Sequence, residues 1–299
     1  NKYIYIFAKK SPNNEYYNLH YSEHEKVTKL ENIKHPIIRE CLKLFRDKYN
    51  FNDKLEISSL SDIISGSGLG SSSAYTVGLL NCLFKLINKK ISKKELAELA
   101  CKIEIEYLKN PIGKQDQYIA SFGSVISLNI FRNGNTSVKR VSNINSKINI
   151  LIRNTLIYDT KMRRKTSQIL NKQNLKTKNN NKNVIDSLDK IKEFGQKTYK
   201  VFFGKKEINY WVHTLHEHWK YKKTLSDKIS FNKINDLYDD LMSKKLIDGG
   251  KIIGAGGGGF FLVYSKKNKK LLIDKIMKQN DLIKFNFSIS LKGSEAFKI

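Results

Sequence analysis

The chain has 299 residues, enough for two domains and a substantial buried core. Hydrophobic residues make up 40% of it and only three residues are proline, as in globular proteins, and no segment approaches the roughly 18 apolar residues of a membrane-spanning helix. The formal net charge of +27 would suit a nucleic-acid-binding protein, but the lysines are spread along the whole chain among asparagines and isoleucines. We therefore expect no specific nucleic-acid partner, whereas the positive field would attract anionic small molecules.

The three cysteines are odd in number and far apart, and each lies in an apolar helical pattern: Cys41, Cys82 and Cys101. This distribution indicates free thiols in a reducing compartment and excludes a disulfide framework or a zinc site. The first residues alternate like a strand and lack the layout of a signal peptide. We expect a cytoplasmic protein without membrane attachment, either a monomer or a homodimer.

The first half of the chain alternates between strand and helix patterns. The predicted strands are residues 3–9, 54–60 and 121–131, and the predicted helices are residues 35–49, 72–86 and 92–108. Ser92 with Glu95 three residues later predicts a capping box at the start of the third helix. Residues 109–118 interrupt the helical pattern, and we expect a loop there.

The second half is richer in helical patterns. One or two strands are expected in residues 148–160, followed by about ninety largely helical residues with an exposed bend at 176–183. The stretch KIIGAGGGGFFLVYS predicts a strand, a glycine turn and a second strand, and a helix at 269–279 precedes extended terminal segments. This order predicts two α+β domains, residues 1–150 and 151–299.

The stretch SGSGLGSSSA, which begins at Ser65, joins a predicted core strand to a predicted core helix. A flexible linker is one interpretation, but linkers do not normally connect two core elements. The alternative is an anion site, because glycines allow close backbone approach and the unpaired N–H groups and dipole of a helix start attract phosphate. No lysine follows the glycines, so the loop is not a Walker A motif.

The second glycine run, Gly254–Gly259, formally contains G-x-G-x-x-G. A strand and not a helix follows it, which excludes a dinucleotide-binding loop. A tight glycine hairpin is one explanation. Five glycines in six residues exceed what a hairpin needs, and the excess favours a backbone that lies against a ligand.

Asp116 follows a Pro/Gly break in the stretch NPIGKQDQY and lies two residues after Lys114. A carboxylate near a lysine can stay ionised and accept a proton from a substrate hydroxyl. A solvated loop aspartate is the alternative, and this stretch alone favours it. Glu104 and Glu106, on the preceding helix, are expected on a solvated face.

The histidines of HTLHEHW do not match the H-E-x-x-H pattern of zinc enzymes. His216 and His218 would lie on different faces of a helix. We therefore interpret them as structural residues or as part of a substrate pocket.

Three stretches taken together resemble the GHMP kinase superfamily, which includes galactokinase, homoserine kinase, mevalonate kinase and phosphomevalonate kinase. GSGLGSSSA is similar to its phosphate-binding second motif, KIIGAGGGGF is similar to its third motif, and NPIGKQDQY occupies the place of its catalytic-aspartate loop. The order and spacing also agree. GKQDQYIASFG, LHEHWKYKKTLSDKIS and GGKIIGAGGGGFFLVY resemble the branch of D-glycero-D-manno-heptose 7-phosphate kinases.

The resemblance implies an α+β, two-domain GHMP kinase fold. Residues 1–150 would form a ribosomal-protein-S5-like, ATP-binding N-terminal domain and residues 151–299 a ferredoxin-like C-terminal domain, with ATP and sugar in the cleft between them. It implies that the chain uses ATP and Mg²⁺ to phosphorylate the anomeric hydroxyl of a heptose 7-phosphate, giving the 1,7-bisphosphate for nucleotide-activated heptose synthesis. The alternatives are a galactokinase-, fucokinase- or mevalonate kinase-like enzyme, a non-catalytic sensor of ATP and sugar, and a basic nucleic-acid-binding module.

The same resemblance implies roles for individual residues. Asp116 takes the position of the catalytic base, with Lys114 tuning its charge, and Ser72 and Glu104 take the positions of the Mg²⁺ ligands. The implied ligands of the ATP phosphates are Gly66, Ser67, Gly68, Leu69, Gly70, Ser71, Ser72 and Ser73. The implied residues on the substrate side are Arg164 and Thr166, from the TKMRRKT segment, and Gly256, Gly257 and Gly258 of the third motif.

Two features depart from the superfamily pattern. Ile64 stands where a proline usually precedes the second motif, a mild change in the stiffness of the loop. The basic, glycine-rich first motif is absent before the opening strand. We expect that roughly thirty N-terminal residues are missing, and with them one cation of the catalytic site.

Overall fold

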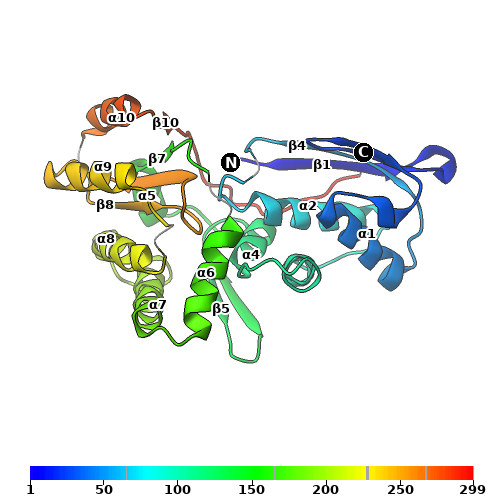
Figure 1. Ribbon diagram of the computed structural model, residues 1–299, viewed down its shortest axis with the longest axis horizontal. Coiled ribbons are helices and arrows are strands. Elements are labelled where there is room, and N and C mark those ends of the chain that lie inside the picture. Colours follow the sequence, from blue (N-terminus) through cyan, green and yellow to red (C-terminus); the bar gives the residue numbers. More distant parts are fainter. Residues whose placement is uncertain (65, 164–165, 227–228, 267, 299) are drawn as a thin grey trace. The chain divides into compact units, whose positions relative to one another are not determined.

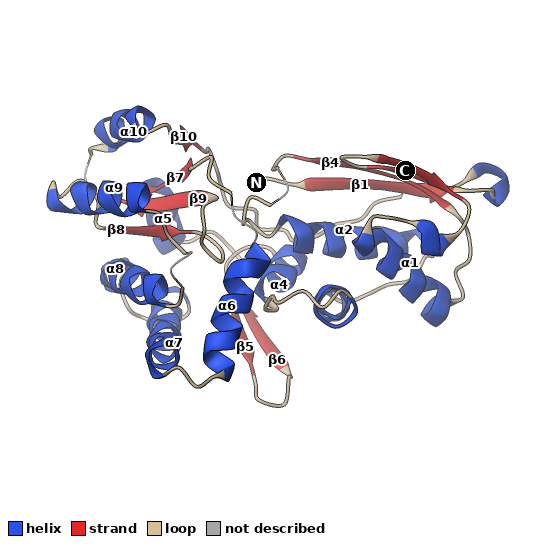
Figure 2. Ribbon diagram, in the orientation of Figure 1, coloured by secondary structure: helices blue, strands red, loops and turns tan. Residues whose placement is uncertain are grey.

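The computed structural model describes residues 1–64, 66–163, 166–226, 229–266 and 268–298 (Figures 1 and 2). Unit 1 consists of Asn1–Ser65, Gly70–Arg140 and Ser290–Ile299, and unit 2 consists of Gly66–Leu69 and Val141–Ile289. Each unit contains a sheet and helices, so the predicted α+β class is confirmed. These units differ from the predicted division at residue 150 in three ways. The chain leaves unit 1 ten residues earlier, its last ten residues return there, and Gly66–Leu69 belong to unit 2.

Unit 1 is built on a four-stranded sheet in the order β1-β4-β2-β3, in which β2 and β4 are parallel and the other pairs antiparallel. Its strands are β1 (Ile4–Lys10), β2 (Tyr17–His20), β3 (His24–Val27) and β4 (Leu55–Ser61). Along β1, Ile4 and Ile6 face the core whereas Tyr5 and Phe7 are exposed. This period of two is the pattern that predicted the strand.

The helices of unit 1 pack against this sheet and against one another. They are α1 (Pro36–Tyr49), α2 (Ser71–Leu86), α3 (Lys93–Cys101) and α4 (Gln115–Phe122). The unit also contains short turns at Pro12–Asn14 and Leu30–Asn32, a π-helical segment at Lys102–Tyr107 and a hairpin of β5 (Ile126–Ile130) and β6 (Thr136–Arg140).

The predicted capping box of Ser92 and Glu95 is confirmed, because each side chain accepts the other residue's backbone N–H. The strand predicted from residue 121 is wrong over its first part, where α4 ends. This two-turn helix is stabilised by packing on α2 and α3 and has little helical pattern of its own.

Unit 2 contains a second sheet, antiparallel throughout, in the order β10-β7-β9-β8. Its strands are β7 (Thr155–Asp159), β8 (Gly249–Ile252), β9 (Phe260–Tyr264) and β10 (Ile283–Lys284), and its helices are α5 (Ser146–Asn154), α6 (Thr166–Lys178), α7 (Lys182–Phe202), α8 (Ile208–Thr224), α9 (Asn232–Ser243) and α10 (Lys270–Gln279). Helix α8 lies between the β8 edge of this sheet and α7 (Figure 1).

One or two strands are predicted in residues 148–160. One strand, β7, is found there, whereas the residues before it form helix α5, because the Asn145 side chain accepts the N–H of Ile148 at 3.0 Å and starts that helix. The bend predicted at 176–183 is confirmed by the turn between α6 and α7. The three cysteines are free, as expected.

None of the helices that the structure describes combines the length and the apolarity needed to cross a lipid bilayer.

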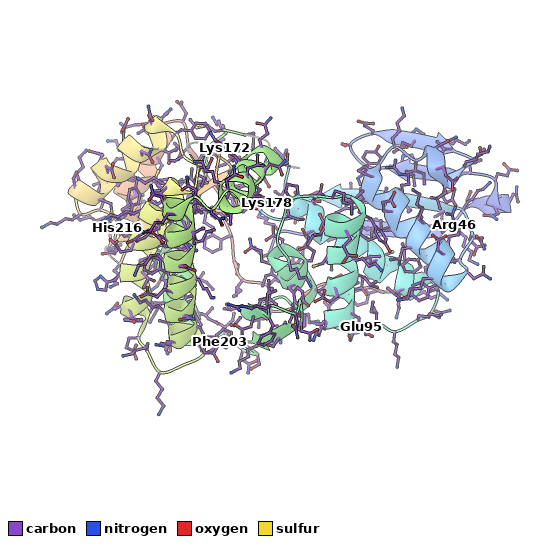
Figure 3. All side chains as sticks on the ribbon, turned by 60° about the horizontal axis from the view of Figure 1, so that its bottom comes forward. Arg46, Glu95, Lys172, Lys178, Phe203 and His216 are labelled. Atoms are coloured by element: carbon purple, nitrogen blue, oxygen red, sulfur yellow. The ribbon has the colours of Figure 1, made fainter. Side chains whose placement is uncertain are left out.

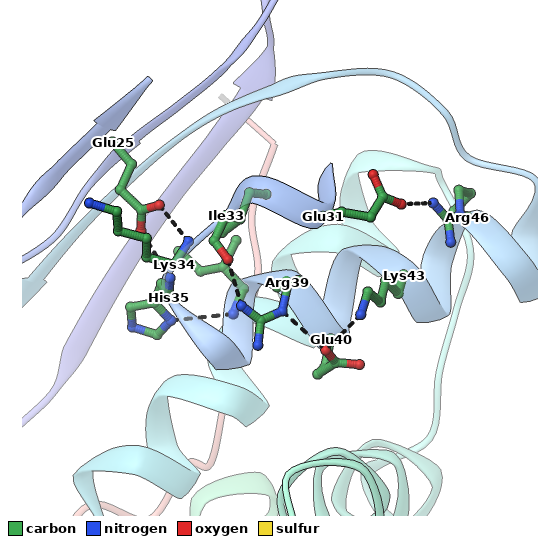
Figure 4. A network of polar contacts seen from close by, with 10 residues as sticks. Glu25, Glu31, Ile33, Lys34, His35, Arg39, Glu40, Lys43 and Arg46 are labelled. Atoms are coloured by element: carbon green, nitrogen blue, oxygen red, sulfur yellow. Dashed lines mark hydrogen bonds and ion pairs between the residues drawn. The ribbon is translucent and has the colours of Figure 1, made fainter. Parts of the chain in front are cut away.

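A buried carboxylate fastens the start of α1 to the sheet of unit 1 (Figure 4). Glu25, only 6% exposed on β3, accepts the backbone N–H groups of Lys34 at 2.6 Å and His35 at 2.9 Å, and the hydroxyl of Tyr21 at 2.6 Å. His35 in turn caps α1 through its Nδ1, which accepts the N–H of Ile38. Burial opposes ionisation of Glu25, but these donors outweigh it and lower its pKa.

Glu25→Ala should lower the free energy of unfolding by about 2 kcal/mol at neutral pH, because two buried amides lose their acceptor. The lowered pKa means that this stabilisation is present above the pKa of an unfolded glutamate, about 4.3, and is lost as the pH falls through the lower folded value. Urea denaturation at pH 7 and pH 3 measures both effects, and the difference between wild type and variant should shrink at pH 3. Glu31→Ala, which removes an exposed partner of Arg46, is the control and should change little; an equal loss in both variants would contradict the prediction.

Candidate active site

The N-terminus of α2 presents unbonded backbone amides. Gly70 precedes the helix in a left-handed conformation, with φ 72° and ψ 24°, and the first helical bond runs from the N–H of Ala74 to its carbonyl at 2.9 Å. Within the part of the chain that the structure describes, the N–H groups of Ser71, Ser72 and Ser73 have no acceptor. Such a helix start, with its dipole, is suited to bind an anion.

A buried glutamate lies beside this helix start. Glu104 is fully buried, its Oε1 accepts the hydroxyl of Ser72 at 2.5 Å and its Oε2 accepts the side-chain amide of Gln117 at 2.6 Å. The expectation of a solvated face is therefore wrong for Glu104, whereas Glu106 is exposed as expected. Ser72 and Glu104, the two residues implied as metal ligands, are brought together by the fold.

The π-helical segment Lys102–Tyr107 carries Glu104 and continues α3 without a break. The sequence predicts one regular helix here. A wider turn shifts the following side chains relative to an α-helix, and such turns are frequent at functional sites. No local pattern distinguishes the two helix types, so the inward position of Glu104 is evident only in the structure.

Asp116 lies in the first turn of α4, against the start of α2. A Cβ atom placed on Gly70 would be 3.1 Å from its Cγ, so the carboxylate fits because residue 70 has no side chain. Burial and the nearby charge of Glu104 raise the pKa of Asp116. Among the residues described, no lysine or arginine forms an ion pair with Asp116 or with Glu104. Glu104 and Asp116 thus form an acidic pair to which no described residue supplies a counter-ion.

Lys114 does not contact Asp116, and the predicted interaction between them is wrong. Its ammonium group donates to Glu98 at 2.8 Å and to the carbonyl of Gly134 at 3.3 Å. Lys114 and Asp116 are two residues apart at the start of helix α4, and side chains at this spacing point in different directions. We therefore do not assign Lys114 a role in catalysis.

The first half of the predicted phosphate loop packs within unit 2 against the second glycine run. A Cβ on Gly254 would be 2.5 Å from the carbonyl oxygen of Gly68, and a Cβ on Gly259 would be 2.4 Å from that of Ser67. The excess of glycines therefore has a cause in the protein itself, because two stretches of backbone touch here. Contact of this run with a ligand stays a prediction.

The implied substrate-side residues of the third motif are tied to neighbouring segments of unit 2. The N–H of Gly257 donates to Ile229 at 2.7 Å, and the N–H of Gly259 donates to Met162 at 2.8 Å. Met162 belongs to the TKMRRKT segment, so this segment lies against the glycine run, and a Cβ on Gly258 would also meet it. Gly256 lies against Ile229. Arg164 and the side chain of Thr166 lie outside the described residues.

Two residues that contact these motifs are not among the predicted ones. Gln117 holds the second oxygen of Glu104, and Lys222 donates to the carbonyl of Ile252 at 3.1 Å and to that of Gly254. The stretch LHEHWKYKK, already singled out for its histidines, contained Lys222. The sequence signal that could have indicated Lys222 is its spacing, because it lies one helical turn after His218 and so on the same face of the predicted helix.

The histidines do not form a metal site. His216, labelled in Figure 3, has its Nδ1 2.5 Å from the hydroxyl of Tyr238, and burial lowers its pKa. Among the described residues no group of three or more His, Cys, Asp or Glu is placed to hold a metal ion. His216 is thus a structural residue, as one of the two interpretations expected.

Comparisons with known proteins agree with this arrangement. Residues 36–124 match the model of the GHMP kinases N-terminal domain. Over 270 residues the chain is 28% identical to the D-glycero-alpha-D-manno-heptose 7-phosphate kinase of Campylobacter jejuni, covering 86% of this chain and 77% of the relative. Among solved structures, a D-glycero-D-manno-heptose 1-phosphate kinase from Bacteroides thetaiotaomicron has a TM-score of 0.79 at 20% identity, covering 100% of this chain and 88% of that one. The mevalonate kinase of Methanococcus jannaschii has a TM-score of 0.69 at 20% identity, covering 96% and 90%.

The chain carries a GHMP kinases N-terminal domain at residues 36–124, is similar to GHMP kinases over most of its length, and has the two-domain GHMP fold that the resemblance predicted. It is accordingly a kinase, an enzyme that transfers a phosphoryl group to a hydroxyl group of its acceptor.

The contact between Gly70 and Asp116 predicts that Gly70→Ala impairs this kinase. A methyl group would press on the carboxylate from 3.1 Å and would strain a residue with φ of 72° by about 1 kcal/mol. We expect turnover to fall at least tenfold, roughly the effect of displacing a catalytic group, while the protein stays folded by circular dichroism. Gly113→Ala, where a Cβ meets nothing within 4 Å, is the matched control and should keep its turnover. Full activity of Gly70→Ala would show that Asp116 does not act from this position.

Proposed function

We propose that this kinase transfers the γ-phosphoryl group of ATP to the anomeric hydroxyl of D-glycero-D-manno-heptose 7-phosphate, giving the 1,7-bisphosphate for the synthesis of nucleotide-activated heptose. The observation that carries the proposal is the partly buried carboxylate of Asp116 beside the unbonded amides of α2. The choice of a phosphorylated heptose is supported by the similarity to a heptose 7-phosphate kinase over 86% of the chain.

The start of α2 would bind nucleotide phosphate. The free N–H groups of Ser71, Ser72 and Ser73 and the helix dipole provide donors and positive potential at one point. Phosphoryl transfer passes through a loose transition state, so positioning and charge stabilisation supply most of the catalysis. One preorganised donor of this kind contributes about 3 kcal/mol in other enzymes.

The oxygens of Ser72 and Glu104 fit the donor set of Mg²⁺. The Ser72 side chain is exposed while Glu104 is buried and fixed by Gln117, and the two oxygens lie 2.5 Å apart. Carboxylate and hydroxyl oxygens are hard ligands, and the acidic pair of Glu104 and Asp116 lacks a protein cation among the described residues. Bound there, Mg²⁺ would neutralise phosphate charge.

Asp116 would orient the acceptor hydroxyl and accept its proton. The carboxylate has no lysine or arginine partner in the described part of the chain, so it is not already neutralised. Burial and Glu104 raise its pKa and so make it a stronger base than an ordinary aspartate.

Product analysis tests the proposal. Purified protein with Mg-ATP should convert D-glycero-D-manno-heptose 7-phosphate to a bisphosphate, identified by mass spectrometry and by a phosphorus signal of an anomeric phosphate. Parallel reactions with heptose, heptose 1-phosphate, galactose, fucose and mevalonate separate this substrate from those of other kinases in the superfamily. Turnover of one of the other compounds with none of heptose 7-phosphate would reassign the substrate, and no turnover of any sugar would overturn the proposal.

Asp116→Asn should lower kcat by about 10²- to 10⁴-fold, the range for loss of a general base, and leave the Kd of ATP nearly unchanged. The base must be ionised to act, and its pKa is raised. As the pH is lowered, the wild-type rate should therefore begin to fall at a higher pH than it would for an ordinary aspartate, whose pKa is about 3.9. This acidic limb should disappear from the residual activity of the variant. Steady-state kinetics between pH 5 and 9 and nucleotide titration measure both; an unchanged pH profile would remove the base assignment.

A further inference from the structure

A group of basic side chains in unit 2 lies next to the second glycine run. It consists of His218 and Lys222 on α8 and Lys251 on β8, and we name it the basic cluster. His218 and Lys222 are four residues apart and share one face of the helix. Lys251 alternates with Gly250 along β8 and so points to the same side of the sheet as Gly249, where a Cβ atom would be 3.4 Å from the side chain of Leu215 on α8.

The basic cluster is partly buried, and none of the described carboxylates forms an ion pair with it. Lys222 bonds only carbonyl oxygens, those of Ile252 and Gly254. Within the residues described, the ammonium group of Lys251 has no hydrogen-bond or ion-pair partner, and the Nδ1 of His218 is buried without one. Glu217, the acidic neighbour on α8, pairs instead with Lys220 at the surface.

The proximity of these groups shows in their electrostatics. Burial, followed by the charge of Lys251, lowers the pKa of Lys222 to about 7. Burial, followed by Lys251 and Lys222, lowers the pKa of His218 to about 3, and burial lowers the pKa of Lys251. The lowered pKa values mean that a protonated, positively charged group is costly at these positions, and a bound anion would offset that cost.

We propose that the basic cluster binds the phosphate group that the sugar substrate already carries, a phosphate monoester dianion. The proposal rests on the proposed function, since it takes a sugar phosphate as the acceptor. Two lysines match the double negative charge of the phosphate. His218 and the third N–H of Lys222 can in addition donate hydrogen bonds to the phosphate oxygens.

The position of the basic cluster favours the substrate over the nucleotide as the source of this phosphate. Lys222 holds the carbonyl of Gly254, the first residue of the glycine run, so a ligand bound to the cluster would lie at that end of the run. The nucleotide phosphates already have donors in the amides at the start of α2. Two similar kinases are both named for a phosphorylated heptose, one for the 7-phosphate and the other for the 1-phosphate.

Lys251→Met tests the proposal in the full chain. Calorimetric titration should show that the wild type binds heptose 7-phosphate about 10- to 100-fold more tightly than heptose, the range for charged hydrogen bonds, and that the variant loses most of this preference. The Kd of ATP should stay unchanged. Without ligand the variant should melt a few degrees above the wild type, because an unpaired buried charge is gone.

Lys220→Met, on the same helix but at the surface, is the matched control and should retain the preference for the phosphorylated sugar. If Lys251→Met failed to fold, His218→Phe would carry the same test with a smaller loss. An unchanged preference in the variant, or a melting temperature below that of the wild type, would show that Lys251 is structural and would overturn the proposal. A weaker affinity for ATP in place of the sugar phosphate would assign the cluster to the nucleotide and would overturn it as well.

These binding measurements need no turnover, so they separate the two proposals. A wild type that binds heptose 7-phosphate through Lys251 but does not phosphorylate it would sustain the basic cluster and overturn the proposed reaction.

Discussion

The structure around the candidate site depends on one buried carboxylate, that of Glu104. Its two oxygens accept hydrogen bonds from Ser72 at the start of α2 and from Gln117 in α4, so three elements of unit 1 meet at one side chain. A buried charge of this kind is tolerated only where polar groups surround it. Asp116 precedes Gln117, and the fixed position of Gln117 therefore also places the proposed base against Gly70. Loss of Glu104 would disturb both the proposed metal ligands and the proposed base.

The second constraint is the contact of backbone with backbone in unit 2. The glycine run lies so close to Ser67 and Gly68 that a methyl group on Gly254 or Gly259 would overlap their carbonyl oxygens. Lys222 and the Met162 carbonyl bind the run from two further segments. A loop held in this way keeps its shape without side chains of its own. Such rigidity is what the proposed binding of a phosphorylated ligand would require.

Charges without partners mark both proposed binding sites, with opposite signs. Among the described residues, the carboxylates of Glu104 and Asp116 in unit 1 form no ion pair with a lysine or arginine, and the lysines of the basic cluster in unit 2 form none with a carboxylate. The overall charge of +27 says little about either site, because most lysines lie on solvated faces. Lys222 and Lys251 differ from lysines at the surface because they are partly buried and their pKa values are lowered, so that holding their positive charge without a counter-ion is costly.

The sequence by itself determined the α+β class, the strands β1 and β4, the helices α1 and α2 and the glycine–serine stretch at the start of α2, because each depends on periodicity or on residues adjacent in the chain. The order of three motifs in it also indicated the similarity to GHMP kinases, whose N-terminal domain matches residues 36–124. Only the tertiary structure decided that Glu104 is buried against Ser72, that Lys114 binds Glu98 and that the glycine run contacts Ser67 and Gly68. It likewise decided that α4 is a helix and that Lys222 bonds the carbonyl oxygens of Ile252 and Gly254, which follow Lys251 in the chain. Each of these depends on which distant segments meet when the chain packs, and local periodicity carries no information about such partners.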